Sequence, residues 1–507
     1  MSNNNQAFKL LLLFFSVTLL LSCSGSKKVD QLTDDNNPRI RPYVKNPGFW
    51  QYKNQPILLL GGSSDDNLFQ HASPDLDEEL DRLVQHGGNY LRCTMSSRDS
   101  GNVFAFAYDS ESGVYDLNKW NDEYWRRFEY FLQETQKRAI IVQIEIWATY
   151  DFYARSSHFI DGQTAWERNP FNPKNNSNYT PYTSGLQEDF KSNGFELINS
   201  FFNTVLPLTE PFDFDLKYTV LEYQQRFVDN LLSISLKYDN VLYVIDNETN
   251  ADPKWSIYWS QYIRHKAAQA KVQIEVSEMW DTYDPTGGAV QGAIVQDPSN
   301  HFFTLRSSIA NTLYDPQNFS FIDISNHNAQ IGEIHYKTGL YVWNEVQNSG
   351  QIRPITNTKI YGNPGGWAGT ATDAQERFWR NIFSGASSVR FHRPNVGIGN
   401  SDLAMSHIKS MRMLSDSLDF FNSSPANELL SERDDNEAYC LKTSGGAYAV
   451  FFTDGGAIGL ESKAGTYKVT WLNILTSSWQ QPESISLPGN LSAPDSGFWV
   501  AKVVKEN

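Results

Sequence analysis

Residues 241–250 read VLYVIDNETN, a short apolar run that ends at an asparagine and a glutamate. The β-branched and aromatic side chains of 241–246 are typical of a strand buried on both faces, as strands of parallel sheets are. Asn247 and Glu248 follow this strand directly. Reactive groups of parallel barrels gather at the carboxyl ends of the strands, so the pair is expected at a pocket. The stretch therefore predicts a buried strand that presents a carboxyl group.

Similar apolar runs lie on both sides of this strand, and segments of helical length separate them. The alternation is the pattern of repeated βα units and predicts an α/β fold, a (β/α)8 TIM barrel, over residues 39–422. The expected strands are 57–62, 89–95, 139–147, 241–246, 272–279, 319–325, 358–362 and 387–392. The expected helices include 76–87, 121–138, 216–238, 254–270 and 372–385. The long connection 150–215 is rich in Trp, Tyr, Asn and Pro, which favours an ordered wall of the pocket over a disordered insert.

Residues 423–507 change character to short alternating strands with glycine-rich turns. The stretches CLKTSGGAYAVFFTDGG (440–456), GTYKVTWLNILTSSWQQ (465–481) and GFWVAKVV (497–504) carry this pattern. They predict a small antiparallel β-sandwich without a catalytic group.

The N-terminal segment indicates export. Lys9 precedes a largely apolar run that is too short to span a bilayer, which is typical of a signal peptide over residues 1–22. The end of this run, Leu-Leu-Ser-Cys, resembles the lipobox of bacterial lipoproteins, in which the cysteine carries the acyl chains; that would be Cys23. The alternative is an ordinary secretory signal with an incidental cysteine. Residues 23–38 are polar and predict a tether. The protein is thus expected in the bacterial cell envelope, lipid-anchored in the outer membrane or at the cell surface.

The composition of the chain limits the kinds of molecule that the protein is expected to bind. The formal charge of −16 argues against nucleic acid, because phosphate binding needs a basic surface. Aromatic residues make up 14% of the chain and could stack on sugar rings or fill cores. No cofactor or metal is expected, since no phosphate-loop lysine, His-Glu-x-x-His or paired-cysteine spacing occurs. DSESGVYDLNKW (109–120) lacks the full ligand set of a calcium loop and predicts a turn.

The Asn-Glu pair after the fourth strand resembles the acid/base motif of the superfamily of retaining (β/α)8 glycoside hydrolases. The resemblance implies that Asn247 binds the sugar hydroxyl beside the reacting carbon and that Glu248 donates the proton to the leaving oxygen. It also implies that Arg92, near the end of the second strand, orients a nucleophile. A salt bridge buried inside the barrel is the alternative role for this arginine.

The resemblance can be narrowed to a family. Residues 57–70, ILLLGGSSDDNLFQ, and 362–392, from GNPGGW to SVRFH, are similar to the beginning and the end of the barrel in apiosidase-like glycoside hydrolases. The C-terminal stretches resemble a domain that often follows that barrel and is named for collagen binding. The implied activity is hydrolysis of O-glycosidic bonds in a polysaccharide or its oligosaccharides.

The resemblance fails at the seventh strand. The superfamily places its nucleophilic glutamate there, whereas the stretch TKIYGNPGGW (358–367) offers Asn363. An amide cannot form the glycosyl ester that retention requires. Either the strand alignment is shifted, another carboxylate has taken over, or the protein binds glycans without cleaving them.

Several carboxylates could replace the missing one. Glu278 and Asp281 lie at the end of the fifth strand, and Glu278 is preferred because this strand is next to the fourth. Glu333, after the sixth strand, comes second, and Asp65 and Asp66 follow the first strand. Glu145 lies inside the third strand and could be a satisfied interior carboxylate.

Other polar and aromatic side chains at the expected strand ends are candidates for substrate binding. These are Asn247, Arg92, Asp65, Asp66, Trp147, Tyr150, Asp151, Asn326, His327, Asn363, Trp367, Arg390, His392 and Arg393. The last three would suit a carboxylated or sulfated sugar, although they could also neutralise acidic loops. The sequence therefore supports two functions, a glycoside hydrolase acting through Glu248 or a surface glycan-binding lipoprotein on the same scaffold. Adhesion through the C-terminal domain is a third, weaker hypothesis.

Overall fold

The computed structural model describes most of the chain from residue 37 onward. Described are residues 37–71, 74–152, 160–189, 200–249, 251–280, 309–325, 330–363 and 368–506, and the backbone of 283–284, 288–289, 294–296 and 302–304. Residues 38–507 form one compact unit. Of the sequence predictions, Cys23, Asp281, Asn326, His327 and Trp367 lie outside the described residues.

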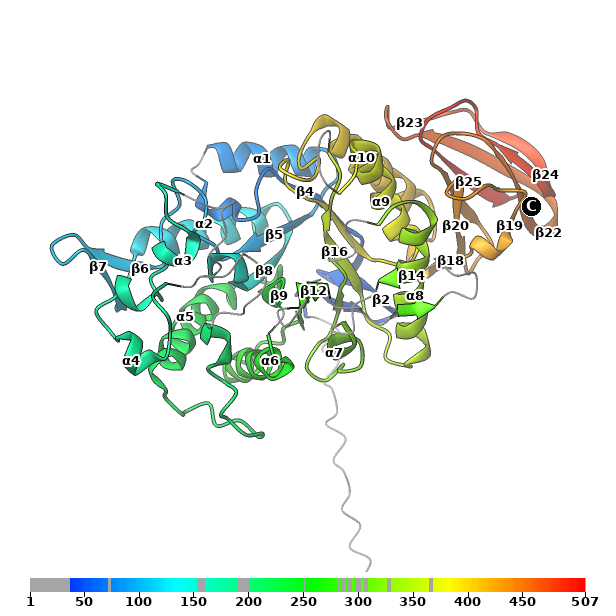
Figure 1. Ribbon diagram of the computed structural model, residues 1–507. Coiled ribbons are helices and arrows are strands. Elements are labelled where there is room, and N and C mark those ends of the chain that lie inside the picture. Colours follow the sequence, from blue (N-terminus) through cyan, green and yellow to red (C-terminus); the bar gives the residue numbers. More distant parts are fainter. Residues whose placement is uncertain are drawn as a thin grey trace, which may run out of the picture. The chain divides into compact units, whose positions relative to one another are not determined.

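Eight parallel strands form the central sheet, which confirms the predicted barrel (Figure 1). In spatial order they are β10, β9, β8, β5, β4, β17, β16 and β15. Their bounds are β4 Leu59–Gly62, β5 Tyr90–Thr94, β8 Ile141–Ala148, β9 Val241–Asn247, β10 Val276–Ser277, β15 Ile322–Asp323, β16 Ile355–Ile360 and β17 Ser388–Phe391. Hydrogen bonds from Ser320 N to Val276 O (2.8 Å) and from Ser277 Oγ to Phe321 O (2.7 Å) join the two edges and close the ring.

The seventh strand differs from its prediction. It was expected at 358–362 but spans Ile355–Ile360 and ends three residues before Asn363. Its pairing with β17 is interrupted by a bulge between Asn357 and Ile360. A bulge adds a residue to one strand and turns the following side chains to a different face, so regular alternation could not place the strand end correctly.

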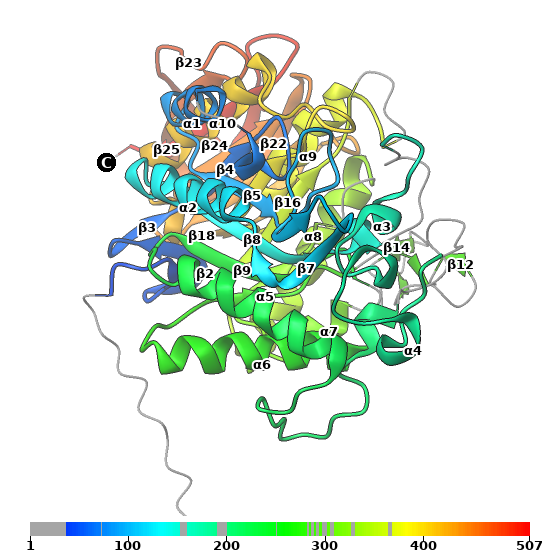
Figure 2. The same cartoon turned by 90° about the vertical axis from the view of Figure 1, so that its left-hand side faces the viewer.

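Helices cover the outside of the barrel (Figures 1 and 2). Their bounds are α1 Asp75–Gln85, α2 Asp122–Lys137, α5 Thr219–Ser235, α6 Pro253–Gln269, α8 Gly332–Asn348, α9 Ala371–Phe383 and α10 Asp402–Ser417. The five predicted helices are all present. Local sequence sets their starts: the side chain of Asn121 accepts a hydrogen bond from Glu123 N at α2, and Thr370 and Asp373 cap each other at α9.

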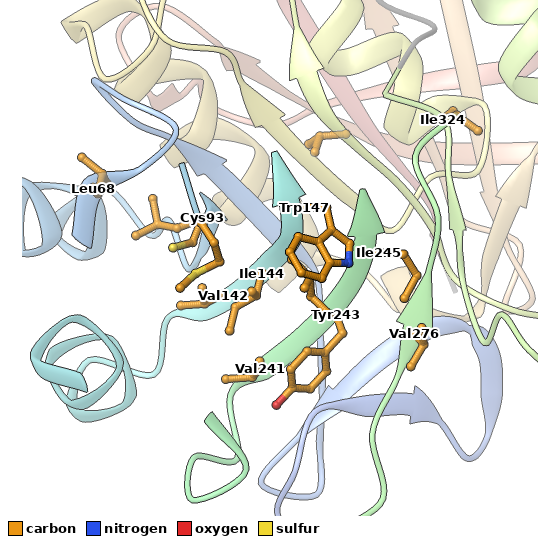
Figure 3. Packing of buried hydrophobic residues seen from close by; sticks show 14 of the residues in the cluster. Leu68, Cys93, Val142, Ile144, Trp147, Val241, Tyr243, Ile245, Val276 and Ile324 are labelled. Carbon is orange, nitrogen blue, oxygen red and sulfur yellow. The ribbon is translucent and has the colours of Figure 1, made fainter. Parts of the chain in front are cut away.

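Successive side chains of a strand point to opposite faces, so the core has one part between strands and helices and another inside the barrel. On β9, Val241, Tyr243 and Ile245 face the helices, as Figure 3 shows. Leu242 and Val244 instead join the barrel interior with side chains of neighbouring strands. This interior core also includes residues of a small N-terminal sheet formed by β1 Arg41–Tyr43, β2 Asn46–Tyr52 and β3 Gln55–Ile57.

Trp50, on β2, anchors this small sheet at the barrel. Its ring lies 5.4 Å from that of Phe321, and its Nε1–H donates to Ser388 Oγ at 2.7 Å. Ser388 begins β17, so the contact lies at the N-terminal end of the barrel strands. Functional groups of such barrels lie at the opposite end, where the strands finish.

The described part of the long connection after β8 is ordered by its own polar side chains. It contains α3 Ala165–Arg168 and α4 Pro181–Ser184. The side-chain amide of Asn169 donates to Asp151 O, and that of Asn172 donates to Trp166 O and Glu188 O. Ordered structure is thus confirmed for residues 160–189, and a role as substrate wall stays a prediction.

The C-terminal residues form the antiparallel domain that the sequence predicts. Its strands are β18 Ser423–Pro425, β19 Leu430–Ser431, β20 Ala438–Thr443, β21 Tyr448–Phe452, β22 Ala457–Asn473, β23 Ser478–Trp479, β24 Glu483–Ser492 and β25 Trp499–Lys505. They belong to one sheet that curls over its own hydrophobic core, because the long strand β22 shifts register between Leu460 and Gly465 and pairs in both halves. The outer face packs on the barrel, where the Phe451 ring stacks 5.1 Å from that of Trp379 on α9.

Candidate active site

Glu248 lies at the carboxyl end of β9 in an unusual backbone conformation. Its φ angle is +62°, the left-handed region that residues other than glycine seldom adopt. Thr149, which follows β8, donates a hydrogen bond from Oγ1 to the carbonyl oxygen of Glu248 at 3.0 Å. The residue is buried, with 7% of its surface exposed. A strained backbone held by neighbouring strands is a recurrent feature of functional sites.

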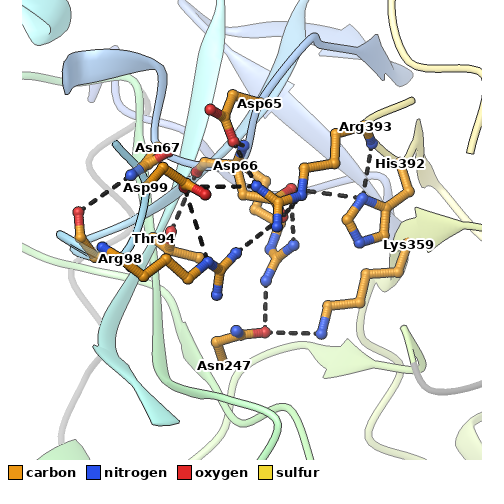
Figure 4. A network of polar contacts seen from close by, with 12 residues as sticks. Asp65, Asp66, Asn67, Thr94, Arg98, Asp99, Asn247, Lys359, His392 and Arg393 are labelled. Atoms are coloured by element: carbon orange, nitrogen blue, oxygen red, sulfur yellow. Dashed lines mark hydrogen bonds and ion pairs between the residues drawn. The ribbon is translucent and has the colours of Figure 1, made fainter. Parts of the chain in front are cut away.

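Lys359 is the closest charged neighbour of Glu248. Its Nζ lies 2.5 Å from Glu248 Oε1 and 2.7 Å from Asn247 Oδ1. Figure 4 shows the lysine directed from β16 towards Asn247. Lys359 lies within the bulged stretch of β16, and this bulge accounts for its direction into the barrel mouth. The seventh strand therefore offers a lysine to Glu248 and not the amide of Asn363.

Arg92, on β5, connects Asn247 to two buried carboxylates. Its Nε donates to both oxygens of Glu145, at 2.6 and 2.7 Å, and its NH2 group donates to Asn247 Oδ1 at 2.5 Å. The NH1 group forms an ion pair with Asp66 at 2.9 Å. The structure thus shows Arg92 as a buried salt-bridge partner, and its role in orienting a nucleophile stays a prediction.

Asp66 is the centre of the remaining charges at this end of the barrel (Figure 4). Besides Arg92, it pairs with Arg390 at 3.1 Å, Arg98 at 3.3 Å and Arg393 at 3.4 Å. Burial alone would raise the pKa of Asp66, but the charges of Arg92, Arg393 and Arg390 hold it well below its ordinary value. Burial also lowers the pKa of His392 well below its ordinary value, so this imidazole is neutral at pH 7.

Arg390 and Arg393 are held by protein carboxylates. Arg393 NH1 lies 2.8 Å from Asp65 Oδ1 and 3.5 Å from Asp99 Oδ2. Arg390 is fully buried and also donates to Thr358 O at 3.0 Å. The donor cluster that could receive a sugar carboxylate or sulfate is therefore compensated within the protein.

The charge state of Glu248 follows from its neighbours. Burial alone would raise the pKa of its carboxyl group, but the charge and hydrogen bond of Lys359, followed by the charge of Arg92, lower it below its ordinary value. Burial lowers the pKa of Lys359, and the nearby Glu248 opposes this effect. The lowered pKa favours the carboxylate form of Glu248 at neutral pH.

Glu278, the preferred second carboxylate, is placed elsewhere. Its Oε1 accepts hydrogen bonds from Asp246 N at 2.9 Å and Met279 N at 2.8 Å, and the side chain is fully buried. It interacts with the Asp246 carboxyl group, which in turn accepts from Trp255 Nε1 of α6 at 2.9 Å. The structure thus directs Glu278 to the helix side of β9. The preceding strand, β10, has only two residues, so the alternation of side chains along it could not predict the direction of Glu278.

Glu333 and Asn363 also lie apart from Glu248. Glu333 belongs to the first turn of α8 and forms an ion pair with Arg433 of the C-terminal domain at 2.7 Å. Asn363 follows the end of β16 and donates from Nδ2 to Pro394 O at 2.8 Å. These contacts give no support to a second carboxylate at Glu333 or to a ligand contact at Asn363, and both roles stay predictions.

The aromatic candidates have different environments. Trp147 is 2% exposed and packs against Phe227 and Trp259, with ring centres 5.3 Å away in each case, so it is a core residue and not a sugar platform. Tyr150 hydrogen-bonds to Glu248 and lies beneath the guanidinium group of Arg98 at 5.7 Å. Of the aromatic candidates within the described residues, Tyr150 is the one that lies at the site.

Asp151 is a buried carboxyl group beside a small cavity. It accepts hydrogen bonds from Ser96 Oγ at 2.6 Å and Ser97 N at 2.9 Å. Burial raises its pKa above the ordinary value. Phe106, Phe171 and other aromatic side chains line the cavity, so its wall is mainly apolar.

Metal ligands and membrane-spanning segments are not found in the described part of the chain. No group of three or more His, Cys, Asp or Glu side chains is arranged there to hold a metal ion. No described helix is long and apolar enough to cross a membrane. Cys93 and Cys440 are both free and buried, as expected of a chain stabilised by its core.

Comparison with solved structures finds the same architecture. A glycoside hydrolase family 5 structure from Bacteroides vulgatus aligns with a TM-score of 0.61 at 11% identity, over 92% of this chain and 93% of that one. Another structure from the same organism aligns with a TM-score of 0.58 at 10% identity, over 93% and 83%. A third, described as a glycoside hydrolase, gives 0.55 at 11% identity, over 93% and 97%. No protein-family profile and no curated protein matches the sequence.

Fold and site together define a structural class. The chain has the (β/α)8 architecture of glycoside hydrolase structures, and the alignments extend over most of both chains. Because the sequence identity is 11%, this likeness establishes the fold alone.

Proposed function

We propose that this protein is a glycoside hydrolase in which Glu248 is the catalytic carboxyl group. The observation that carries the proposal is the Asn247–Glu248 pair at the carboxyl end of β9, in a strained backbone conformation and tied to Arg92 and Lys359. Barrel enzymes bind their substrates at this end of the strands. The fold shared with glycoside hydrolase structures supports the same assignment.

The charges at the site favour an uncharged glycan. Five cationic side chains face five carboxylates in this network. The cations are Arg92, Arg98, Lys359, Arg390 and Arg393, and the anions are Asp65, Asp66, Asp99, Glu145 and Glu248. Because the two sets balance, an anionic sugar would have to displace a protein carboxylate from a buried pair. We therefore propose a neutral polysaccharide or its oligosaccharides as substrate, with a carboxylated or sulfated sugar as the less favoured choice.

A second candidate function is glycan binding without cleavage. The specific observation in its favour is Lys359, which faces Glu248 from the seventh strand, where the resemblance led us to expect a nucleophilic glutamate. Glycosidic bond cleavage ordinarily uses two carboxyl groups. A binding protein could keep the barrel and its polar mouth without that pair.

The deciding experiment compares the purified protein with its Glu248→Gln variant on neutral plant and microbial polysaccharides. Reducing ends are counted for turnover, and retardation in glycan-containing gels is measured for binding. Cleavage by the unmodified protein that disappears in the variant, with binding retained, supports the hydrolase. Binding of a glycan by both proteins without any turnover supports the second function.

We further propose that the protein is anchored in the bacterial cell envelope through lipid on Cys23. The apolar run before this cysteine and the polar residues after it support the proposal. Such an anchor would hold the barrel at a membrane surface where extracellular glycans are met.

A further inference from the structure

Three side chains from different parts of the barrel act on the Glu248 carboxyl group. Lys359 of β16 and Arg92 of β5 bring positive charge, and Tyr150, after β8, brings a hydrogen bond. Tyr361, just after β16, is also close enough for its hydroxyl group to sense the charge of Glu248. After burial, the largest effects on the charge of Glu248 thus come from the two cations.

The contact with Lys359 is short and buried. The lysine is 2% exposed and its Nζ makes charge-assisted bonds to Glu248 Oε1 at 2.5 Å and Asn247 Oδ1 at 2.7 Å. Removal of one partner from such a pair leaves an uncompensated buried charge, which is costly. The lysine therefore stabilises one charge state of Glu248 and also one position of its side chain.

A proton donor needs the opposite environment. General acids of glycosidases have a raised pKa, produced by apolar surroundings or by a nearby carboxylate. Glu248 has a cation at hydrogen-bond distance, and this contact favours the ionised form. The geometry thus disagrees with the acid role that the resemblance implies for Glu248.

We infer that Lys359 is a positioning residue that keeps Glu248 ionised, so that Glu248 enters the reaction as a carboxylate and not as the proton donor. The part of this inference that concerns the reaction rests on the proposed glycoside hydrolase function. The ionisation state itself can be measured without any substrate. A different group must then protonate the leaving oxygen. The Asn-Glu motif alone implies instead that Glu248 donates this proton.

The direct test is a pH titration followed by carbon-13 NMR of protein labelled at glutamate side-chain carboxyl carbons. The Glu248→Gln variant identifies the Glu248 signal, because that signal alone disappears from the spectrum. In the unmodified protein this signal should titrate below the ordinary glutamate range. Lys359→Met should move the midpoint upward by roughly 1–3 pH units, the usual effect of losing an opposite charge at this distance. Lys359→Arg, the matched control that keeps the charge, should leave the midpoint low.

A midpoint above the ordinary range in the unmodified protein would overturn the inference, and so would a midpoint unchanged by Lys359→Met. The measurement on the unmodified protein decides the matter even if Lys359→Met fails to fold. Where turnover is found, Lys359→Met should move the acidic limb of the pH–rate profile to higher pH. Movement of the alkaline limb would show instead that Glu248 is the proton donor. If no glycan is cleaved, the proposed function fails, while the titration still confirms or refutes the role of Lys359.

Discussion

Stability at alkaline pH should depend on Glu278, which shares a buried site with Asp246 behind the strand that carries Glu248. Both side chains are fully buried. Burial raises the pKa of Glu278 to about 8. Burial, followed by the charge of Glu278, raises the pKa of Asp246 well above its ordinary value. At neutral pH the pair therefore retains at least one proton that two exposed carboxyl groups would have lost.

The size of the effect follows from the difference between folded and unfolded protein. The pKa of Glu278 is about 8 in the folded protein and 4.5 in the reference state, a difference of about 3.5 units. Each unit corresponds to about 1.4 kcal/mol, so the unfolding free energy should fall by up to about 5 kcal/mol through this residue. The folded protein binds the proton more tightly, and the loss therefore develops as pH rises from about 4.5 to about 8 and ends above the folded pKa.

The test compares urea unfolding of the unmodified protein and Glu278→Gln from pH 5 to pH 9. Glutamine preserves an acceptor for Asp246 N and Met279 N but cannot ionise. The stability of the variant should decline less across this range, by several kcal/mol, and its relative stability should improve steadily with pH. Glu222→Gln, an exposed residue of α5, serves as the control and should follow the unmodified protein. Parallel decline of all three proteins would refute the argument.

Three further predictions concern the site, the barrel and the location. Glu248→Gln should lower the rate of glycan cleavage by roughly 10²–10⁴-fold and leave binding within a few-fold, as measured by reducing-end release and gel retardation; equal rates would exclude a catalytic role. Gly61→Ala should lower the thermal midpoint, because its added Cβ would lie 2.0 Å from Tyr90 O on the neighbouring strand; an unchanged midpoint in calorimetry would contradict the close approach. Cys23→Ala should move the protein from the membrane fraction to a soluble or unprocessed form, and unchanged fractionation would rule out the lipid anchor.

The barrel could be predicted because its signal is repeated and local. Each strand must bury apolar side chains against helices, so runs such as 139–147 and 241–246 stand out from the amphipathic segments around them. The fourth strand was predicted to end before Asn247, and the structure places its end at that residue. Strand identity and the position of Glu248 at the mouth follow from this pattern alone.

The partners of Glu248 could not be predicted in the same way. Lys359 lies within the seventh predicted strand, 358–362, and a lysine in a buried strand was a signal that something unusual occurs there. Its direction depends on the bulge in β16, which regular alternation does not contain. Glu333 illustrates a different limit, because its partner Arg433 lies one hundred residues away in another domain. Long-range pairs of this kind are determined by tertiary packing, which one sequence does not reveal.

The network also determines which face of Asn247 is offered to a ligand. Its Oδ1 accepts hydrogen bonds from two cations, Arg92 NH2 at 2.5 Å and Lys359 Nζ at 2.7 Å. Neither cation can accept a hydrogen bond, so the amide must place oxygen, and not nitrogen, towards them. The Nδ2 group, which is the donor of this side chain, then points away from the two cations. A hydroxyl group of a sugar is an acceptor suited to it. Lys359 thus affects both members of the Asn247–Glu248 pair, by orienting the amide and by holding the carboxylate ionised.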